Sequence, residues 1–415
     1  MDKSSKKRGL VNASYLTIGN LFSQVIGVFG FIYIARILGP EAYGIFITVT
    51  SFVGLFTLFT LKGLNRVIVR EGCKDIDNLP RILNQTIGIR NAFIIFSIII
   101  CIISTELTGY SNQVKFFIML YSLELAEYGI SSYLSTIFQA SERMKFLAIF
   151  DIVNRLLITS FSVLFLFMGY GLLELFLVHL CCYLLVIICK YYTSKTIAKF
   201  NFLSPIKFDK VIIRSAITFS LIGFLNIFVV RVDAVMISLM STSTDVGLYG
   251  VAFKISREAI LLRNIAIISF LPILVKRFAE GPVKQFTMVK YTFGFFFLIL
   301  FLTLCSLYFI DDFIILFFGN EYASSARILK IMSFYLCFWW AVFPYVTAAQ
   351  ATHNEQFILL PILIMAILNI GFNYVLFYEF GLIGFAYSKV LVHIVGSLVL
   401  CFLIHFKLRE QGHLV

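Results

Sequence analysis

Charged residues are scarce in this sequence. Only 13% of the 415 residues are Asp, Glu, Lys or Arg, whereas 60% are hydrophobic and 47 are phenylalanine. A soluble core does not need so much apolar surface. Apolar runs of about 20 residues recur along the chain, and each can cross the roughly 30 Å hydrocarbon core of a bilayer as a helix. The composition excludes an ordinary soluble protein and predicts a polytopic membrane protein.

Long polar segments are also missing. No stretch between apolar runs exceeds about 25 residues, which leaves no room for a soluble catalytic domain. We expect no cleaved signal peptide, because the first apolar run, 11–35, is too long and lacks a small-residue cleavage site. Only Cys73 lies in a polar loop, so neither a disulfide framework nor a zinc site is expected. The sequence predicts no catalytic residue, metal or cofactor.

Twelve transmembrane helices are predicted from the apolar runs. They span about 11–35, 43–61, 86–104, 114–137, 148–168, 172–189, 215–239, 248–275, 290–310, 326–348, 357–378 and 382–405. Lys and Arg gather in the even-numbered connections and at both termini, so these parts are predicted to be cytoplasmic in an inner cell membrane. The net charge of +12 is therefore interpreted as topology and not as nucleic-acid binding.

The two halves of the chain repeat each other. Three pairs of corners match in order, at offsets of about 206 to 211: Gly39-Pro-Glu-Ala-Tyr43-Gly44 with Asp245-Val-Gly-Leu-Tyr249-Gly250, Gln139 to Phe146 with Gln350 to Phe357, and Phe167 to Leu172 with Phe377 to Leu382. Because each half has six helices, the repeat is parallel. The sequence predicts two six-helix lobes, 1–189 and 215–415, joined by a cytoplasmic linker at 190–214.

Charges at membrane depth mark a candidate site, since they are costly in a bilayer. The seventh and eighth predicted helices carry four of them at similar depths: Arg231, Asp233, Lys254 and Arg257. Cations outnumber carboxylates there, which suits an anionic ligand. Three arginines near the ends of the first two helices are predicted to extend this site: Arg36, Arg66 and Arg70.

Several of these charges also have a structural interpretation. Arg231 could neutralise Asp233 or Glu258, and Lys254 could pair with Glu258. Three carboxylates are candidates for binding a coupling ion, namely Glu124, Glu127 and Glu258, although the first two could equally line a solvated cavity. His179 and Lys389 occupy equivalent positions in the repeat, and the histidine is interpreted as a hydrogen-bonded core residue.

Four motifs follow one another along this frame. They are Ala35-Arg36-Ile-Leu-Gly39-Pro40-Glu-Ala-Tyr43-Gly44; Gly63-Leu64 followed by Val69-Arg70-Glu71; Arg231-Val-Asp233 followed by Val246-Gly-Leu-Tyr249; and Phe318-Gly319-Asn-Glu-Tyr322 before Ile328-Leu329-Lys330. Together they resemble the polysaccharide transporter branch of the multidrug/oligosaccharidyl-lipid/polysaccharide (MOP) exporter superfamily, which includes the O-antigen flippases. The resemblance covers nearly the whole chain.

The resemblance implies a V-shaped, all-α bundle of two lobes. Such a protein moves a polyprenyl-diphosphate-linked oligosaccharide, such as an O-antigen repeat unit, from the cytoplasmic to the outer leaflet by alternating access. Cations in its cavity would then face the diphosphate and acidic sugars. The expected partners are the lipid-linked glycan, membrane lipids and, as a further candidate, a polysaccharide polymerase.

Two other functions stay open. A cation-coupled drug exporter of the same superfamily has a similar frame, but such exporters place a carboxylate in their first helix, and 11–35 has none. A membrane glycan polymerase or glycosyltransferase would need a carboxylate cluster or a large polar loop at one leaflet. The predicted outer loops are too short to favour it.

Overall fold

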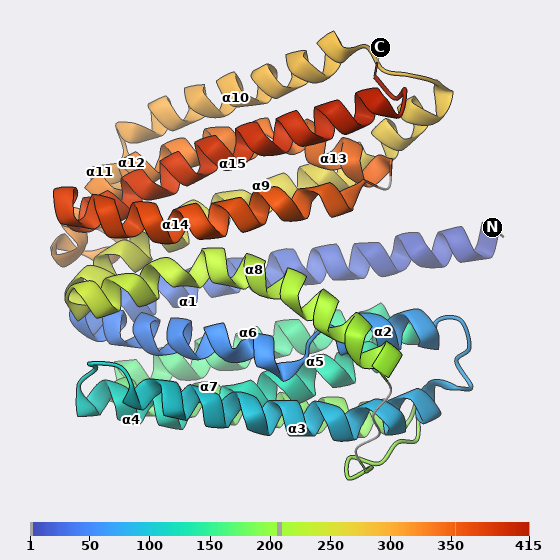
Figure 1. Ribbon diagram of the computed structural model, residues 1–415. Coiled ribbons are helices and arrows are strands. Elements are labelled where there is room, and N and C mark those ends of the chain that lie inside the picture. Colours follow the sequence, from blue (N-terminus) through green and yellow to red (C-terminus); the bar gives the residue numbers. More distant parts are fainter. Residues whose placement is uncertain (1–2, 206–209, 353, 415) are drawn as a thin grey trace. The chain divides into compact units, whose positions relative to one another are not determined.

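The computed structural model describes residues 3–205, 210–352 and 354–414, and these residues are helical almost throughout (Figure 1). The β contact among them is an isolated bridge between Val283 and Leu414. In chain order the helices are α1 (Lys3–Leu55), η1 (Phe56–Thr60), α2 (Leu64–Gly72), α3 (Leu79–Glu106), α4 (Asn112–Tyr121), α5 (Glu124–Ala140), α6 (Met144–Phe167), α7 (Leu172–Lys195), α8 (Lys210–Met240), α9 (Ser243–Glu280), α10 (Gln285–Leu307), α11 (Ile310–Phe318), η2 (Asn320–Tyr322), α12 (Ala323–Ala341), α13 (Phe343–Ala351), η3 (Glu355–Ile358), α14 (Leu359–Phe380) and α15 (Leu382–Glu410), where η marks a 3-10 helix.

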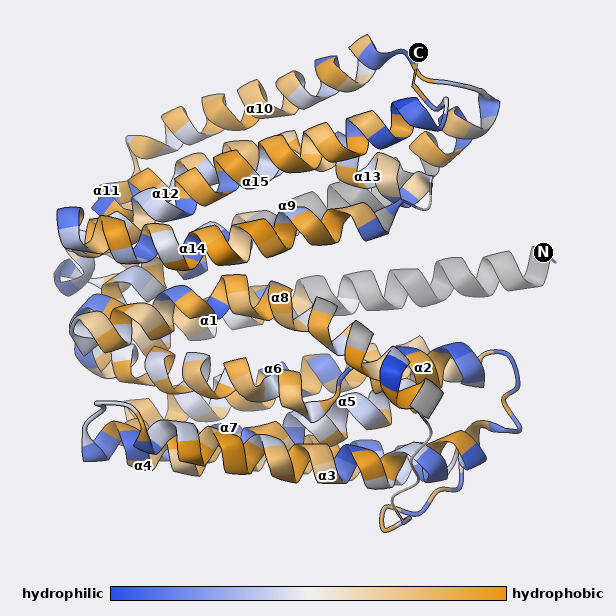
Figure 2. Cartoon of the chain, in the orientation of Figure 1, coloured by the Kyte–Doolittle hydropathy of each residue, from blue (hydrophilic) through white to orange (hydrophobic). Residues whose placement is uncertain are grey.

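Many of these helices are long and apolar. Within the described residues, eight helical stretches are long and apolar enough to cross a membrane, and a ninth is added if the bent α8 counts as one span. Apolar residues cover α10 along its length (Figure 2), and Phe293, Phe297 and Phe301 are exposed on it. Such surface is stable in lipid and not in water. The chain is therefore a multi-pass, all-α membrane protein, whereas the count of twelve spans stays a prediction.

The predicted break between the first two apolar runs lies inside α1. Gly39 leaves the helical conformation, with φ 69° and ψ 170°, and Pro40 follows it. Glycine tolerates this positive φ because it has no Cβ, and proline supplies no N–H to the turn before it. α1 thus consists of two helices on either side of Gly39, as the sequence predicts.

The structure corrects the predicted elements in two ways. The connections predicted at 62–85 and 311–325 contain short helices, α2 and α11. The runs predicted as single helices at 114–137 and 326–348 are interrupted, by Ser122 and Leu123 between α4 and α5 and by Val342 between α12 and α13. These interruptions keep right-handed helical dihedrals, so hydropathy alone does not reveal them.

The chain forms two compact units. The N-terminal unit contains Met1–Leu38 and Ile45–Ile227, and the C-terminal unit contains Gly39–Gly44 and Phe228–Val415. In the N-terminal unit a core joins α2, α3 and α5 through residues such as Ile68, Leu83 and Ile137, each fully buried. In the C-terminal unit a second core joins α13 and α15 to the start of α10.

The predicted linker at 190–214 is partly folded onto the N-terminal unit, and its residues 206–209 lie outside the described part. α7 continues to Lys195, and Lys190, predicted to lie in a loop, is 5% exposed. Its ammonium donates to the Ser131 and Ser135 hydroxyls at 3.0 and 3.4 Å. The Asp151 carboxylate lies 4.0 Å from the same ammonium. Two hydroxyl groups and one carboxylate therefore compensate for the burial of this charge.

The orientation of the spans can be tested with cysteine labelling. Lys199 and Asp312 are both exposed, and three predicted spans separate them. In a background without the native cysteines, we expect an impermeant maleimide to label Asp312→Cys in intact cells and Lys199→Cys only after the membrane is opened. Labelling of both positions from one side would contradict the predicted six-helix frame.

Candidate functional site

A cavity of about 340 Å³ lies in the N-terminal unit, where η1 and α2 meet α8. Its polar lining includes Lys62, Asn65 and Arg66, and its apolar lining includes Phe219 and Phe224. Gly63 allows α2 and α8 to approach closely, because a Cβ there would lie 1.9 Å from the carbonyl oxygen of Ala216. The Gly63 N–H donates to the Ser220 hydroxyl at 2.8 Å and fixes this contact.

The two cations that line this cavity each stand over an aromatic ring. The Arg66 guanidinium lies 5.1 Å from the centre of the Phe219 ring. The Lys62 ammonium donates to the Tyr128 hydroxyl and lies 4.8 Å from the centre of that ring. A guanidinium over an aromatic ring can keep N–H groups available for a carboxylate or a phosphate. The cavity therefore suits an anionic group, and it contains Arg66 of the predicted site.

Arg70 and Arg36 lie elsewhere on this unit. Arg70 is exposed and pairs with Glu71 at 2.8 Å, and Lys74 pairs with the same carboxylate at 3.0 Å. Hydrogen bonds from Lys74 and Arg70 lower the pKa of Glu71 below its usual value. Arg36 is exposed on α1, near the break at Gly39. Neither Arg36 nor Arg70 is among the residues that line the cavity.

A fully buried arginine, which the sequence analysis missed, binds residues that line the cavity or lie next to it. Arg90 of α3 donates to the carbonyl oxygens of Leu61 and Gly129 at 2.9 Å, and to Ser132 and Asn65 at 2.6 and 3.2 Å. Leu61 has a left-handed conformation with φ 52°, where η1 ends. A cation is favourable at the exposed carbonyls of a helix end. Arg90 thus fixes the turn that carries Lys62.

The candidate coupling carboxylates lie in the same unit, at the start of α5. Glu124 and Glu127 both act electrostatically on Tyr183 of α7, as does Arg155 of α6. The Arg155 guanidinium in turn packs against α1, 2.8 Å from where a Cβ on Gly27 would lie. Both predicted carboxylates and Arg155 therefore lie in the surroundings of one tyrosine.

A buried carboxylate network organises the C-terminal unit. Asp233 of α8 is 1% exposed, and its carboxylate accepts four hydrogen bonds. Asn369 and Asn373 of α14 donate at 2.8 and 2.9 Å, the Tyr249 hydroxyl of α9 at 2.7 Å, and the Lys389 ammonium of α15 at 2.6 Å. Asp233 is thus surrounded by the chain's own donors.

Lys389 completes this network as its cation. Its side chain is 4% exposed, and it also donates to the carbonyl oxygen of Val229 at 3.1 Å and lies 4.9 Å from the centre of the Phe253 ring. The sequence analysis considered Arg231 and not Lys389 as the partner of Asp233. The pairing differs because α15, more than 150 residues away in sequence, packs beside α8.

The other predicted residues of this unit lie on α8 and α9. Lys254 pairs with Glu258 at 2.8 Å, as the structural interpretation allowed, and both side chains are partly exposed. Arg257 is exposed, and Arg231 is half-buried. α9 begins at Ser243, five residues before the predicted start, because the Thr242 hydroxyl accepts from the Asp245 N–H and caps the helix. Lys254 and Arg257 therefore lie about 7 Å further along the helix than predicted.

Two signals in the sequence could have revealed these features. Thr242 followed by Asp245 is a helix-start pattern. Asn369 and Asn373 have the i,i+4 spacing of one helix face inside an apolar run, which indicates a polar partner in the bundle. No comparable pattern pointed to Arg90, half of whose acceptors are backbone carbonyls.

Comparisons with known proteins agree with this architecture. The chain is similar to the solved structure of the lipid II flippase MurJ in an inward closed conformation, with 16% sequence identity, a TM-score of 0.76, and coverage of 93% of this chain and 86% of that one. It is also similar to an inward-facing multidrug resistance MATE family transporter of the MOP superfamily, with 13% identity, a TM-score of 0.71 and coverage of 94% and 95%. A mutant of the Vibrio cholerae MATE transporter VcmN matches with 12% identity, a TM-score of 0.60 and coverage of 97% of each chain.

Identities this low show the fold and not the substrate. No curated protein matches the chain in sequence. The family profile described as "Polysaccharide biosynthesis protein" matches residues 10–278, which is more than half of the chain. With the fold of the MOP transporters, the chain therefore belongs to the polysaccharide biosynthesis protein family.

Proposed function

We propose that this protein is a flippase for a polyprenyl-diphosphate-linked oligosaccharide, moving it from the cytoplasmic to the outer leaflet by alternating access. The observation that carries the proposal is the cavity lined by Lys62, Asn65 and Arg66. Family membership and the similarity to a lipid II flippase support the same substrate class. A polysaccharide polymerase that consumes the product is a candidate partner.

The chemistry of the cavity fits a diphosphate. Arg66 offers a planar set of N–H donors, Lys62 offers a compact ammonium, and Asn65 offers an amide. Phe219 and Phe224 provide apolar surface beside them, where a sugar ring or the first isoprene units can pack. In the C-terminal unit, Arg231, Lys254 and Arg257 remain proposed contacts to the headgroup. Among these, Arg257 is the most exposed, whereas Lys254 is already paired with Glu258.

A cation-coupled drug exporter is the second candidate function. It is favoured by the similarity to MATE transporters and by the grouping of Glu124 and Glu127 around Tyr183. The first part of α1, before Gly39, has no carboxylate among residues 11–38. The two functions differ in their substrates: an exporter of lipophilic cations needs a negative or neutral cavity, whereas the cavity beside α2 is lined by two cations.

The flippase function can be tested by truncating Arg66. In vesicles that contain a fluorescent polyprenyl-diphosphate oligosaccharide, we expect Arg66→Ala to slow translocation roughly 10- to 100-fold, since a charge-assisted hydrogen bond contributes about 1.5–3 kcal/mol. Arg66→Lys should recover only part of the rate, because an ammonium cannot bind a phosphate through two parallel N–H groups.

Lys74→Ala is the matched control. Lys74 carries the same charge, lies in the same connection and is exposed, but it does not line the cavity. Its loss should leave the rate unchanged. Wild-type translocation by folded Arg66→Ala protein would contradict the assignment of this cavity. Efflux of a lipophilic cation such as ethidium, without translocation of the lipid-linked glycan, would favour the exporter.

A further inference from the structure

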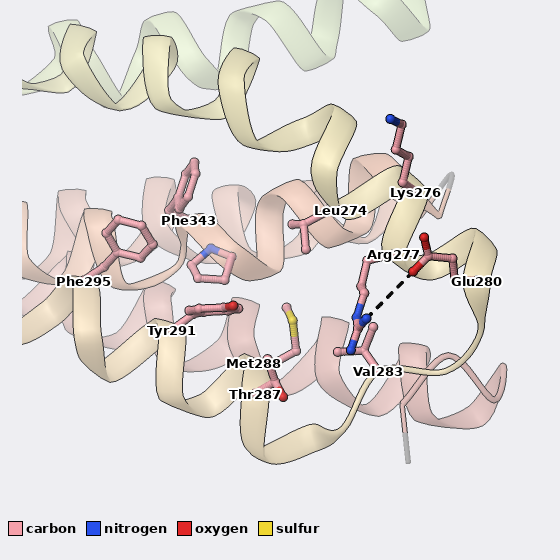
Figure 3. A pocket seen from close by; sticks show the side chains of 11 residues that line it. Leu274, Lys276, Arg277, Glu280, Val283, Thr287, Met288, Tyr291, Phe295 and Phe343 are labelled. Atoms are coloured by element: carbon pink, nitrogen blue, oxygen red, sulfur yellow. Dashed lines mark ion pairs between the residues drawn. The ribbon is translucent and has the colours of Figure 1, made fainter.

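A second cavity, of about 410 Å³, lies in the C-terminal unit between the end of α9, the start of α10 and the start of α13 (Figure 3). We call it the α9–α10 pocket. One part of its wall is apolar and aromatic, formed by Leu274, Met288, Tyr291, Phe295 and Phe343. Met288 and Phe343 are almost fully buried, and Val283, which also lines the pocket, is held by its N–H donating to the His413 carbonyl oxygen at 2.9 Å. The pocket therefore has fixed walls.

The other part of the wall is charged. Lys276, Arg277 and Glu280 stand at the end of α9, and in Figure 3 the Arg277 guanidinium lies beside Val283, whereas the Lys276 side chain points to the opposite side of the helix. The Arg277 and Glu280 side chains approach to 3.8 Å, but each is 69% exposed. Such an exposed ion pair is weak, so Glu280 only partly offsets the two cations. This end of the pocket is positive.

The exposed surface of α10 beside the pocket is also apolar. Tyr291 lines the pocket and is also exposed, and Phe293 and Phe297 are exposed on the next turns of α10. In a membrane protein such a face contacts lipid chains. By the positive-inside rule, Lys276 and Arg277 belong to a cytoplasmic connection. The pocket thus joins a lipid-facing helix surface to a cationic end at the cytoplasmic side.

We propose that the α9–α10 pocket binds an anionic phospholipid of the cytoplasmic leaflet. Its phosphate lies at the Arg277 guanidinium, and an acyl chain packs along Met288, Tyr291 and Phe295. Lys276, on the other side of the helix end, adds to the positive potential that the headgroup meets. The apolar wall excludes a small soluble anion as the natural occupant, because it leaves most of the pocket without polar partners. The net positive end selects an anionic headgroup over a zwitterionic one. This site is independent of the proposed flippase cavity, which lies in the other unit.

The two tryptophans of the chain provide a probe for this site. The Trp340 ring lies 6.2 Å from Phe295 and 6.3 Å from Phe343, both of which line the pocket. Trp339 instead packs against His393 of α15, at 5.5 Å. In the full chain with Trp339→Phe, Trp340 is the single tryptophan, and a brominated acyl chain in the pocket quenches its fluorescence.

We expect dibromo-phosphatidylglycerol to half-quench Trp340 at about fivefold lower mole fraction than dibromo-phosphatidylcholine, in vesicles otherwise made of phosphatidylcholine, since one net charge near the surface contributes about this factor. Replacing Lys276 and Arg277 by Gln should bring the two lipids to the same half-quenching fraction. Lys284→Gln with Lys290→Gln removes two cations of the same connection that do not line the pocket, and the preference should persist.

Three results would overturn the proposal. These are equal quenching by the two lipids in the parent chain, a preference that survives loss of Lys276 and Arg277, and an equal loss in the Lys284 and Lys290 control, which would mean general surface attraction. If Trp339→Phe lowers the yield of folded protein, the same comparison in the chain with both tryptophans keeps the test, because the difference between lipids is the readout.

Discussion

Replacing Lys389 by Met should lower the free energy of unfolding by about 3–5 kcal/mol, because the buried Asp233 carboxylate loses its counter-charge. The two side chains are 4% and 1% exposed and meet at 2.6 Å, so water cannot replace the ammonium. The three remaining donors, Tyr249, Asn369 and Asn373, are neutral. Thermal unfolding of the detergent-solubilised protein, followed by tryptophan fluorescence, measures this effect as a lower midpoint.

Two further variants show whether charge is the cause. Asp233→Asn combined with Lys389→Met removes both charges, and we expect it to recover much of the loss, since replacing a buried ion pair by neutral groups is often tolerated. Lys254→Met breaks the ion pair with Glu258, whose side chains are 32% and 26% exposed, and should cost only about 0–1 kcal/mol. A Lys389→Met protein that unfolds like the wild type would contradict the network.

The helices of this fold were largely predictable from the sequence because hydropathy records contact with lipid. The long runs that became α6, α7, α10 and α15 carry few charges and were found within about six residues of their bounds. α2 was missed for the opposite reason. It buries Leu64, Val67 and Ile68 on one face while exposing Arg66 and Arg70, so its average composition is that of a polar loop.

The candidate site was predicted in parts. The sequence named Arg66 as a candidate near a helix end, and the cavity around it depends on Gly63 touching α8, a contact across more than 150 residues. It identified Asp233 as unusual but could not find its partners on α14 and α15. Long-range packing decides such pairs, and one sequence does not record it. Lys389 differs from an exposed lysine only through this packing.

Within the C-terminal unit, the segment Gly39–Gly44 contacts the start of α9 closely, and this contact gives the second large prediction. A Cβ on Gly247 of α9 would lie 1.9 Å from the carbonyl oxygen of Pro40, and a Cβ on Gly44 would lie 1.7 Å from that of Ser243. Both partners are backbone atoms, so no side chain can rotate away. We expect Gly247→Ala to cost more than about 4 kcal/mol or to prevent folding, because a rigid backbone crossing must separate.

Gly294→Ala is the matched control for this prediction. Gly294 lies within α10, and a Cβ there meets no atom within 4 Å. Since alanine favours a helix by about 0.5–1 kcal/mol over glycine, this variant should be at least as stable as the wild type. The yield of monodisperse protein on size exclusion and the midpoint of thermal unfolding distinguish the two variants.

The position of this crossing ties the prediction to the internal repeat. Aligning Tyr43 with Tyr249 makes Gly247 the counterpart of Glu41, the neighbour of Pro40. Pro40 and Gly247 are therefore nearly equivalent positions of the predicted repeat. Bulk added at Gly247 is opposed by the backbone of the Pro40 turn. If Gly247→Ala folds and melts like Gly294→Ala, the corners do not cross at backbone distance, and the repeat has no contact of this kind.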